Sequence, residues 1–117
     1  MNISVFDLSQ LDGNNGFRID GKSDSTSGTS VSTIGDVNGD GFDDVVVGAH
    51  SSFNPSNNGF IGSNYVVFGS GSGFSAAMDL SSLDGSNGFG IDAITPYDRS
   101  TVSIDNAGDI NGDGVTD

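Results

Sequence analysis

Apolar residues in this chain come in short runs separated by glycine, asparagine, aspartate and serine. Apolar and other residues alternate in the runs "GFRID" at 16–20 and "GFGID" at 88–92, and they alternate at the start of "TSVSTI" at 29–34. This alternation predicts strands with one buried face. The continuous runs "DVVVGA" at 44–49 and "NYVVFG" at 64–69 predict strands that are buried on both faces. No stretch carries a useful helical period, so the pattern predicts an all-β fold.

Two segments recur in the same order along the chain. "FDLSQLDGNNGFRID" at 6–20 returns as "MDLSSLDGSNGFGID" at 78–92, a shift of 80 − 8 = 72, and "GDVNGDGFDD" at 35–44 returns as "GDINGDGVTD" at 108–117, a shift of 109 − 36 = 73. The chain therefore holds about 1.6 copies of a four-stranded unit. Such units predict β-propeller blades of four antiparallel strands and hence an incomplete propeller. A parallel β-helix is the alternative, although its coils usually repeat at shorter intervals.

The repeat divides the chain into three parts. We assign residues 1–21 to the outer part of a preceding blade, 22–93 to one complete blade and 94–117 to the start of the next. Because a propeller needs about four to eight blades to close, we expect further blades, either from the same longer chain or from other copies. The stop inside a repeat favours a longer chain.

The repeated acidic segments are candidate metal loops. Both follow the pattern D-x-N-x-D-G-x-x-D, in which alternate residues turn their oxygens inward and the glycine permits the turn. Ca²⁺ takes six to eight hard oxygens, and several carboxylates held together would repel each other without a cation. The candidate ligands are Asp36, Asn38, Asp40, the Phe42 carbonyl and Asp44 in the first loop, and Asp109, Asn111, Asp113, the Val115 carbonyl and Asp117 in the second.

Two other interpretations of these loops are possible. A polar hairpin turn explains "NG" and "DG", but a turn needs only two of these residues and does not need them twice. An EF-hand needs a bidentate carboxylate at position 12, where this chain has Val47 followed by a strand rather than a helix. The interpretation that remains is a cation clip between two strands of one blade.

Composition narrows the partners. The formal net charge is −13 and all sixteen acidic residues are aspartate, which argues against nucleic acid and anionic membranes. No apolar stretch approaches the length of a membrane helix, so we expect no membrane insertion. The chain has no cysteine, no glutamate and one histidine, His50, which leaves little for a nucleophile or a general base. We expect no enzyme, no catalytic residues and no organic cofactor.

The stretch "TSVSTIGDVNGDGFDDVVVGAH" at 29–50 resembles an FG-GAP repeat, the blade unit of the integrin α-subunit propeller and of many bacterial secreted proteins. The family's final proline is His50 here, and its "FG" survives as Phe89-Gly90 but not at Phe17-Arg18. The resemblance implies a seven-bladed, calcium-clipped propeller used for adhesion or ligand binding. The matching residues are Gly28, Ser30, Val31, Gly35, Asp36, Asn38, Gly39, Asp40, Gly41, Asp44, Gly48 and Ala49, and in the second copy Asp109, Asn111, Gly112, Asp113, Gly114 and Asp117.

Together these features predict a calcium-binding module of an extracellular or cell-surface protein, since millimolar external Ca²⁺ fills moderate sites. A structural spacer in a large secreted protein, or the non-catalytic part of a polysaccharide-acting enzyme, are the alternatives. The polar loop expected at 51–63, with Phe53 and Phe60, is the candidate site for a protein or carbohydrate ligand.

Overall fold

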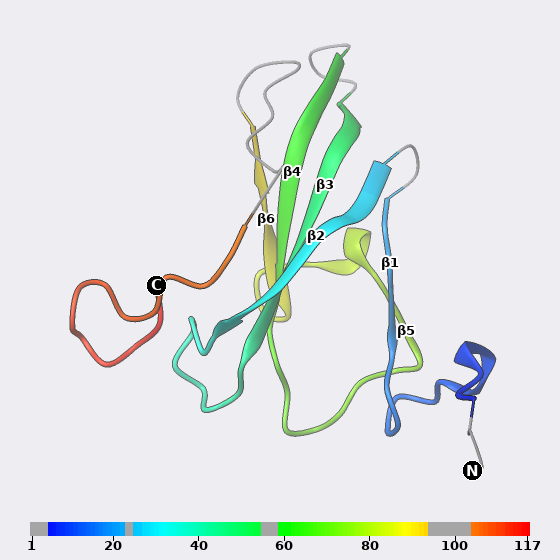
Figure 1. The fold of residues 1–117 in the computed structure, drawn as a ribbon, viewed down its shortest axis with the longest axis horizontal. Helices are drawn as coiled ribbons and strands as arrows, with labels where there is room; N and C mark the ends of the chain where they lie inside the picture. Colours follow the sequence, from blue (N-terminus) through cyan, green and yellow to red (C-terminus); the bar gives the residue numbers. More distant parts are fainter. Residues whose placement is uncertain (1–4, 23–24, 55–58, 94–103) are drawn as a thin grey trace.

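The computed structural model describes residues 5–22, 25–54, 59–93 and 104–117, and for residues 50–54 and 59–61 it describes the backbone alone. Its main element is an antiparallel four-stranded sheet in the order β2-β3-β4-β6 (Figure 1). The strands are β2 (Ser25–Gly35), β3 (Asp44–Asn54), β4 (Gly59–Val67) and β6 (Gly88–Asp92). The only helical segments in the described part are two short 3₁₀ turns, η1 (Leu8–Gln10) and η2 (Leu80–Ser82). The fold is all-β, as predicted.

The central strands β3 and β4 carry the apolar runs that predicted them. Val45 faces Val67 and Val47 faces Tyr65 across the ladder, which then continues to Phe53↔Phe60. The expected loop at 51–63 is therefore wrong, since β3 extends to residue 54 and β4 begins at residue 59. Backbone pairing does not need apolar side chains, so the hairpin runs on through a stretch that looked like a polar loop. The ligand role of Phe53 and Phe60 lies outside the described side chains.

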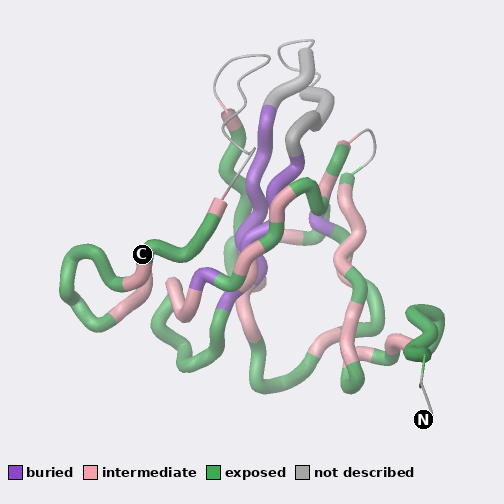
Figure 2. The backbone as a smooth tube through the Cα atoms, viewed as in Figure 1, coloured by how far each residue is buried: buried purple, intermediate pink, exposed green. Residues whose placement is uncertain are grey.

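Both faces of the sheet carry apolar side chains, and Figure 2 shows that the buried residues gather on the central strands β3 and β4. We call the side with Val47, Ala49, Tyr65 and Val67, against which Leu80 packs, the first face. The second face carries Ile34, Val46 and Val66. Burial on both sides follows from the continuous apolar runs and is typical of a sheet that packs between two neighbours.

The first face is covered by a small two-stranded element. β1 (Arg18–Asp20) pairs in parallel with β5 (Ala77–Asp79), in the register Arg18↔Ala77, Ile19↔Met78 and Asp20↔Asp79. Ile19 and Met78 pack on the core of the first face. Just before β1, the ring of Phe17 stacks on Phe74 with centroids 4.1 Å apart. This pairing was not predicted from the sequence.

The sequence repeat is a structural repeat as well. Asp7 caps η1 by accepting the Ser9 N–H at 2.9 Å, and Asp79 caps η2 by accepting the Ser81 N–H at 2.8 Å. The turns that follow close in the same way, since Gly13 donates to the Gly16 carbonyl at 2.9 Å and Gly85 to the Gly88 carbonyl at 2.8 Å. Closely similar local sequence thus forms the same capped and closed turns before β1 and before β6.

Candidate metal centre

The first acidic loop joins β2 to β3, whose facing ends are Gly35 and Asp44. Gly39 and Gly41 have φ angles of 75° and 93°, a region that residues with a side chain rarely adopt. The glycines let the backbone turn sharply twice within a few residues. Asp36 and Asp40 are thereby brought into one short loop.

The side-chain oxygens at positions 1, 3 and 5 organise this loop through backbone N–H groups. Asp36 accepts from Asp40 at 3.0 Å and from Gly41 at 2.7 Å. Asn38 Oδ1 accepts from Asp40 at 3.2 Å, and Asp40 Oδ1 accepts from Phe42 at 2.9 Å. Asn38 also donates its amide to Asp40 Oδ2 at 3.2 Å. These short-range bonds are typical of aspartate and asparagine in turns, and they fix the position of each oxygen.

Asp44 at position 9 differs from the others because it is fully buried. Its Oδ2 accepts the Val37 N–H at 2.9 Å, and its Oδ1 accepts the Gly69 N–H at 2.8 Å. The carboxylate thus ties the acidic loop to the segment that follows β4. Buried carboxylates are usually paired with a cation. In the described part of the chain, however, the one salt bridge joins Arg18 to Asp20.

Most of these hydrogen bonds recur in the second acidic loop, although the Asn111 amide donates to Asp117 at 3.2 Å and not to Asp113. Asp109 accepts from Asp113 at 3.1 Å and from Gly114 at 2.8 Å, and Asp113 accepts from Val115 at 2.9 Å. The Gly114 N–H is the main reason why the pKa of Asp109 lies below its ordinary value. Asp117 accepts from Ile110 at 2.9 Å, as Asp44 does from Val37, but it is exposed.

The donor chemistry of both loops fits a hard cation. Every candidate atom is an oxygen, and an oxygen that accepts one N–H keeps a second lone pair for a metal. The backbone N–H groups that donate to the side chains at positions 1, 3 and 5 hold their oxygens in one short segment. Across the described residues, no three acidic or imidazole side chains converge on one metal position. The ligand set therefore stays a prediction.

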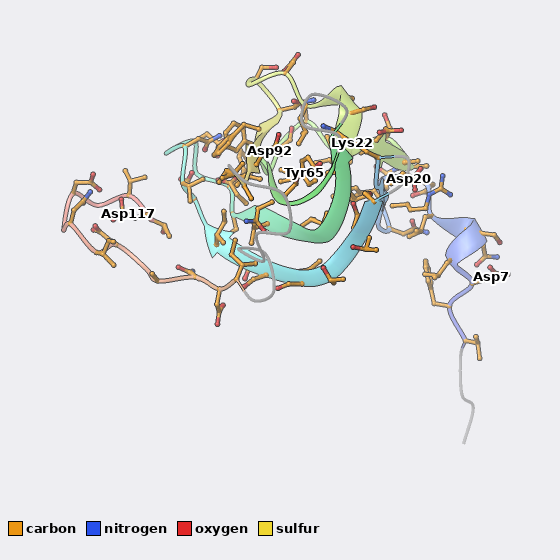
Figure 3. The ribbon with its side chains drawn as sticks, turned by 90° about the horizontal axis from the view of Figure 1, so that it is seen from above. Asp7, Asp20, Lys22, Tyr65, Asp92 and Asp117 are labelled. Atoms are coloured by element: carbon orange, nitrogen blue, oxygen red, sulfur yellow. The ribbon has the colours of Figure 1, made fainter. Side chains whose placement is uncertain are left out.

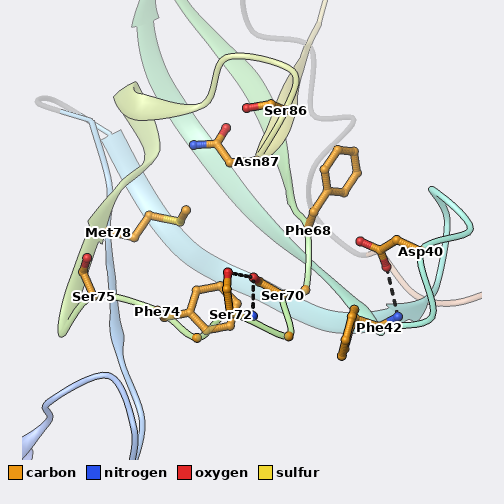
Figure 4. Close-up of a pocket in the computed structure, with 13 residues that line it drawn as sticks. Asp40, Phe42, Phe68, Ser70, Ser72, Phe74, Ser75, Met78, Ser86 and Asn87 are labelled. Atoms are coloured by element: carbon orange, nitrogen blue, oxygen red, sulfur yellow. Dashed lines mark hydrogen bonds between the residues drawn. The ribbon is translucent and has the colours of Figure 1, made fainter.

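A pocket of about 480 Å³ lies beside the first loop, between Asp40, Phe42 and the segment 69–75 (Figure 4). Phe42 packs on Gly71 and Gly69. A Cβ added to Gly71 would lie 2.5 Å from the Phe42 ring, and a Cβ added to Gly69 would lie 2.9 Å from the Cβ of Phe42. The loop and the segment after β4 therefore meet twice, through Phe42 and through Asp44. Sequence reasoning missed this contact, although the run "GSGSG" at 69–73 signals a backbone that something approaches closely.

A four-stranded antiparallel sheet with two apolar faces and a loop of this kind is typical of a β-propeller blade. Residues 27–64, about a third of the chain, match the FG-GAP repeat family. The chain therefore carries an FG-GAP repeat at residues 27–64, and its all-β fold with an antiparallel four-stranded sheet is consistent with an incomplete propeller, as the sequence predicted. No curated protein and no solved structure matches the chain. In the described residues no helix is long and apolar enough to cross a membrane.

Proposed function

We propose that this chain is a calcium-binding β-propeller module in which each acidic loop holds one Ca²⁺. The observation that carries the proposal is the duplicated bonding pattern. In loops 36–44 and 109–117 the side-chain oxygens at positions 1, 3, 5 and 9 accept from equivalent backbone N–H groups, although Asp44 is buried and Asp117 is exposed. Local sequence alone, rather than surrounding packing, thus forms the loop. The same nine-residue pattern is kept in both copies.

Each loop would supply the ligands from its own residues. Asp36, Asn38 and Asp40 lie in one turn, the Phe42 carbonyl follows, and Asp44 closes the loop at the start of β3. Asp109, Asn111, Asp113, the Val115 carbonyl and Asp117 are the corresponding set in the second loop. A bound Ca²⁺ would neutralise part of the net charge of −13 and clamp β2 to β3 at their facing ends.

We further propose that the module is non-catalytic and acts outside the cell, in adhesion or ligand binding. An oxygen-only loop of this kind suits millimolar external Ca²⁺, with dissociation constants on the order of 10⁻⁴–10⁻³ M in extracellular modules. The chain lacks cysteine and glutamate, and its acidic pairs are accounted for by the loops. A spacer role in a large secreted protein is the second candidate, favoured by the structural repeat.

A calorimetric Ca²⁺ titration of the chelator-stripped chain tests the proposal. We expect two sites in the wild type, one in Asp40→Ala, one in the matched variant Asp113→Ala, and none in the double variant. Asp43→Ala is the control, since Asp43 is an exposed aspartate of the first loop outside the ligand positions. The proposal fails if the folded wild type does not bind, or if Asp43→Ala loses a site as Asp40→Ala does.

A further inference from the structure

Partial copies of the repeating unit cover the two faces of the sheet. On the first face, Ile19 of β1 packs against the buried core. On the second face, Ile104 packs against Ile34, Val46 and Val66, in the segment that leads into the second acidic loop. Figure 3 shows Asp7 and Asp117, which belong to these two copies, on opposite sides of the sheet. Each face of the complete unit is thus covered by a fragment of a neighbouring unit.

β1 is the copy of the second half of β6. Of the fifteen residues at 6–20, eleven are identical at 78–92, so Phe17 corresponds to Phe89 and Ile19 to Ile91. Phe17 stacks on Phe74 and Ile19 lies on the first face, but Phe89 is 41% exposed and Ile91 50% exposed. Equivalent side chains are therefore covered at one end of the repeat and open at the other.

The open pair borders an apolar groove on the second face. The groove has a volume of about 260 Å³ and also lies next to Ile34, Val46, Val66 and Ile104. β6 is the last strand of the sheet, so its outer edge has no strand partner in the described part of the chain. A free edge beside exposed apolar side chains is a template for another strand.

The geometry points to a second copy of this chain as the occupant: we propose that the second face of one molecule docks on the first face of another, with β6 taking the place that β1 holds. The intramolecular pairing fixes the register. Gly90 would lie opposite Ala77, Ile91 opposite Met78 and Asp92 opposite Asp79, in parallel, as Arg18, Ile19 and Asp20 do now. Phe89 would then stack on Phe74 of the other copy.

Docking of this kind displaces both partial copies, which therefore act as caps. The segment 5–21 leaves the first face of one molecule. The segment 104–117 leaves the second face of the other, because a docked unit brings its own loop 36–44 to the place that 109–117 occupies. Within the described residues, the second cap is held by the packing of Ile104, by a hydrogen bond of 2.9 Å from Ser32 to Asp105 and by the contact of Thr116 with Gly35.

The caps keep the wild-type chain monomeric at low concentration. A strand tethered by a short linker competes at an effective concentration on the order of millimolar, which a second molecule at micromolar concentration does not reach. Repulsion between two molecules of charge −13 opposes docking further at low salt. Weakening a cap, or screening the charge, shifts the balance towards association.

Matched substitutions in β1 and β6 should have opposite effects on self-association, and this tests the proposal. The association constant is measured by sedimentation velocity in chelator and 0.5 M NaCl. Ile19→Asp places a charge in the first-face cap, and Arg18→Pro removes the N–H that donates to the Ala76 carbonyl at 2.9 Å. Both should raise the association constant at least about tenfold, the equivalent of weakening the cap by 1.4 kcal/mol. Ile91→Asp should remove association, alone and combined with Ile19→Asp. Ile110→Asp, at a 74% exposed position in the second loop, is the control and should change nothing.

Far-UV circular dichroism confirms which variants are folded, and Arg18→Pro decides the question if Ile19→Asp is not. The proposal is overturned if the folded cap variants stay monomeric. It is also overturned if association persists when Ile91→Asp is added, because the uncovered first face would then associate without the help of β6. Since chelator is present throughout, the result is independent of whether the acidic loops bind Ca²⁺.

Discussion

Asp44 shows at the scale of one residue how the acidic loop is built into the blade. Three of the predicted ligands in its loop organise their own turn, but Asp44 also reaches Gly69, 25 residues further along the chain. Its carboxylate is fully buried and accepts two backbone N–H groups. The sequence motif predicted Asp44 as a ligand, and the structure adds a role in holding the strands together without any metal.

Replacing Asp44 with alanine should therefore destabilise the metal-free protein by about 2–4 kcal/mol, because two partly buried N–H groups lose a charged acceptor. Urea unfolding in the presence of a chelator measures this loss. Asp43→Ala, one position earlier and exposed, should stay within about 0.5 kcal/mol. Equal losses in the two variants would show that Asp44 acts through general charge rather than through its two hydrogen bonds.

Asp84, in the turn before β6, should make the stability of the protein depend on pH. Hydrogen bonds from the Ser86 hydroxyl, and then from the Ser86 N–H, lower the pKa of Asp84 below its ordinary value of 3.8. A pKa that is lower in the folded state stabilises the protein above the unfolded value, and this contribution is lost as pH falls through the folded value. Wild type should thus be more stable than Asp84→Asn at pH 6, and the gap should close below pH 3.8. Ser86→Ala, which removes the first of these bonds, should narrow the gap, and a gap that is constant with pH would contradict the assignment.

At the scale of elements, the sequence predicts strands well where an apolar run defines the strand. It predicts them poorly where the strand exists only because another strand pairs with it. The valine runs gave β3 and β4, and alternation gave β2 and β6. The three-residue strand β5 has no pattern of its own, and it exists because β1 pairs with it. The outer halves of β3 and β4 were mistaken for a loop, since their pairing depends on backbone bonds that polar residues make equally well.

Gly88 is the residue on which the β4–β6 pairing depends most directly. Its φ angle is 146°, and an added Cβ would lie 2.1 Å from the Val66 carbonyl oxygen. Gly88→Ala should therefore cost at least about 2 kcal/mol by forcing the strand away from β4. Gly90→Ala is the matched control in the same strand, because its Cβ would meet the Tyr65 ring at 3.5 Å and the Asn64 carbonyl oxygen at 3.9 Å, which are ordinary contact distances. Chemical denaturation of both variants separates a local clash from a general loss of strand flexibility.

For the whole molecule, the repeat was the most informative feature of the sequence. It located both acidic loops, and the structure adds that the repeated segments at 6–20 and 78–92 form capped turns with matching hydrogen bonds. What the repeat left open was the long-range arrangement, such as the contact of Phe42 with Gly71 and the position of β1 on the first face. These contacts depend on how elements meet in space, which a local pattern does not encode.

Charge acts on the molecule as a whole. Sixteen carboxylates face three basic residues in a body of 50 × 37 × 30 Å. At 0.01 M salt the screening length is about 30 Å, so carboxylates on opposite sides still repel each other, whereas at 0.15 M it is about 8 Å. The compact state concentrates this repulsion more than the unfolded chain does. In chelator, the urea midpoint should therefore rise as NaCl is increased from 0.01 to 0.15 M and flatten above that.

Screening does not distinguish between monovalent cations, so choline chloride should raise the midpoint as much as NaCl does. Calcium chloride at matched ionic strength should raise it further in the wild type, but not in the double variant Asp40→Ala/Asp113→Ala, which keeps most of the charge and lacks a central ligand of each loop. An equal gain from Ca²⁺ in that variant would show that divalent ions act by diffuse neutralisation. A gain confined to the wild type would place the effect in the two loops.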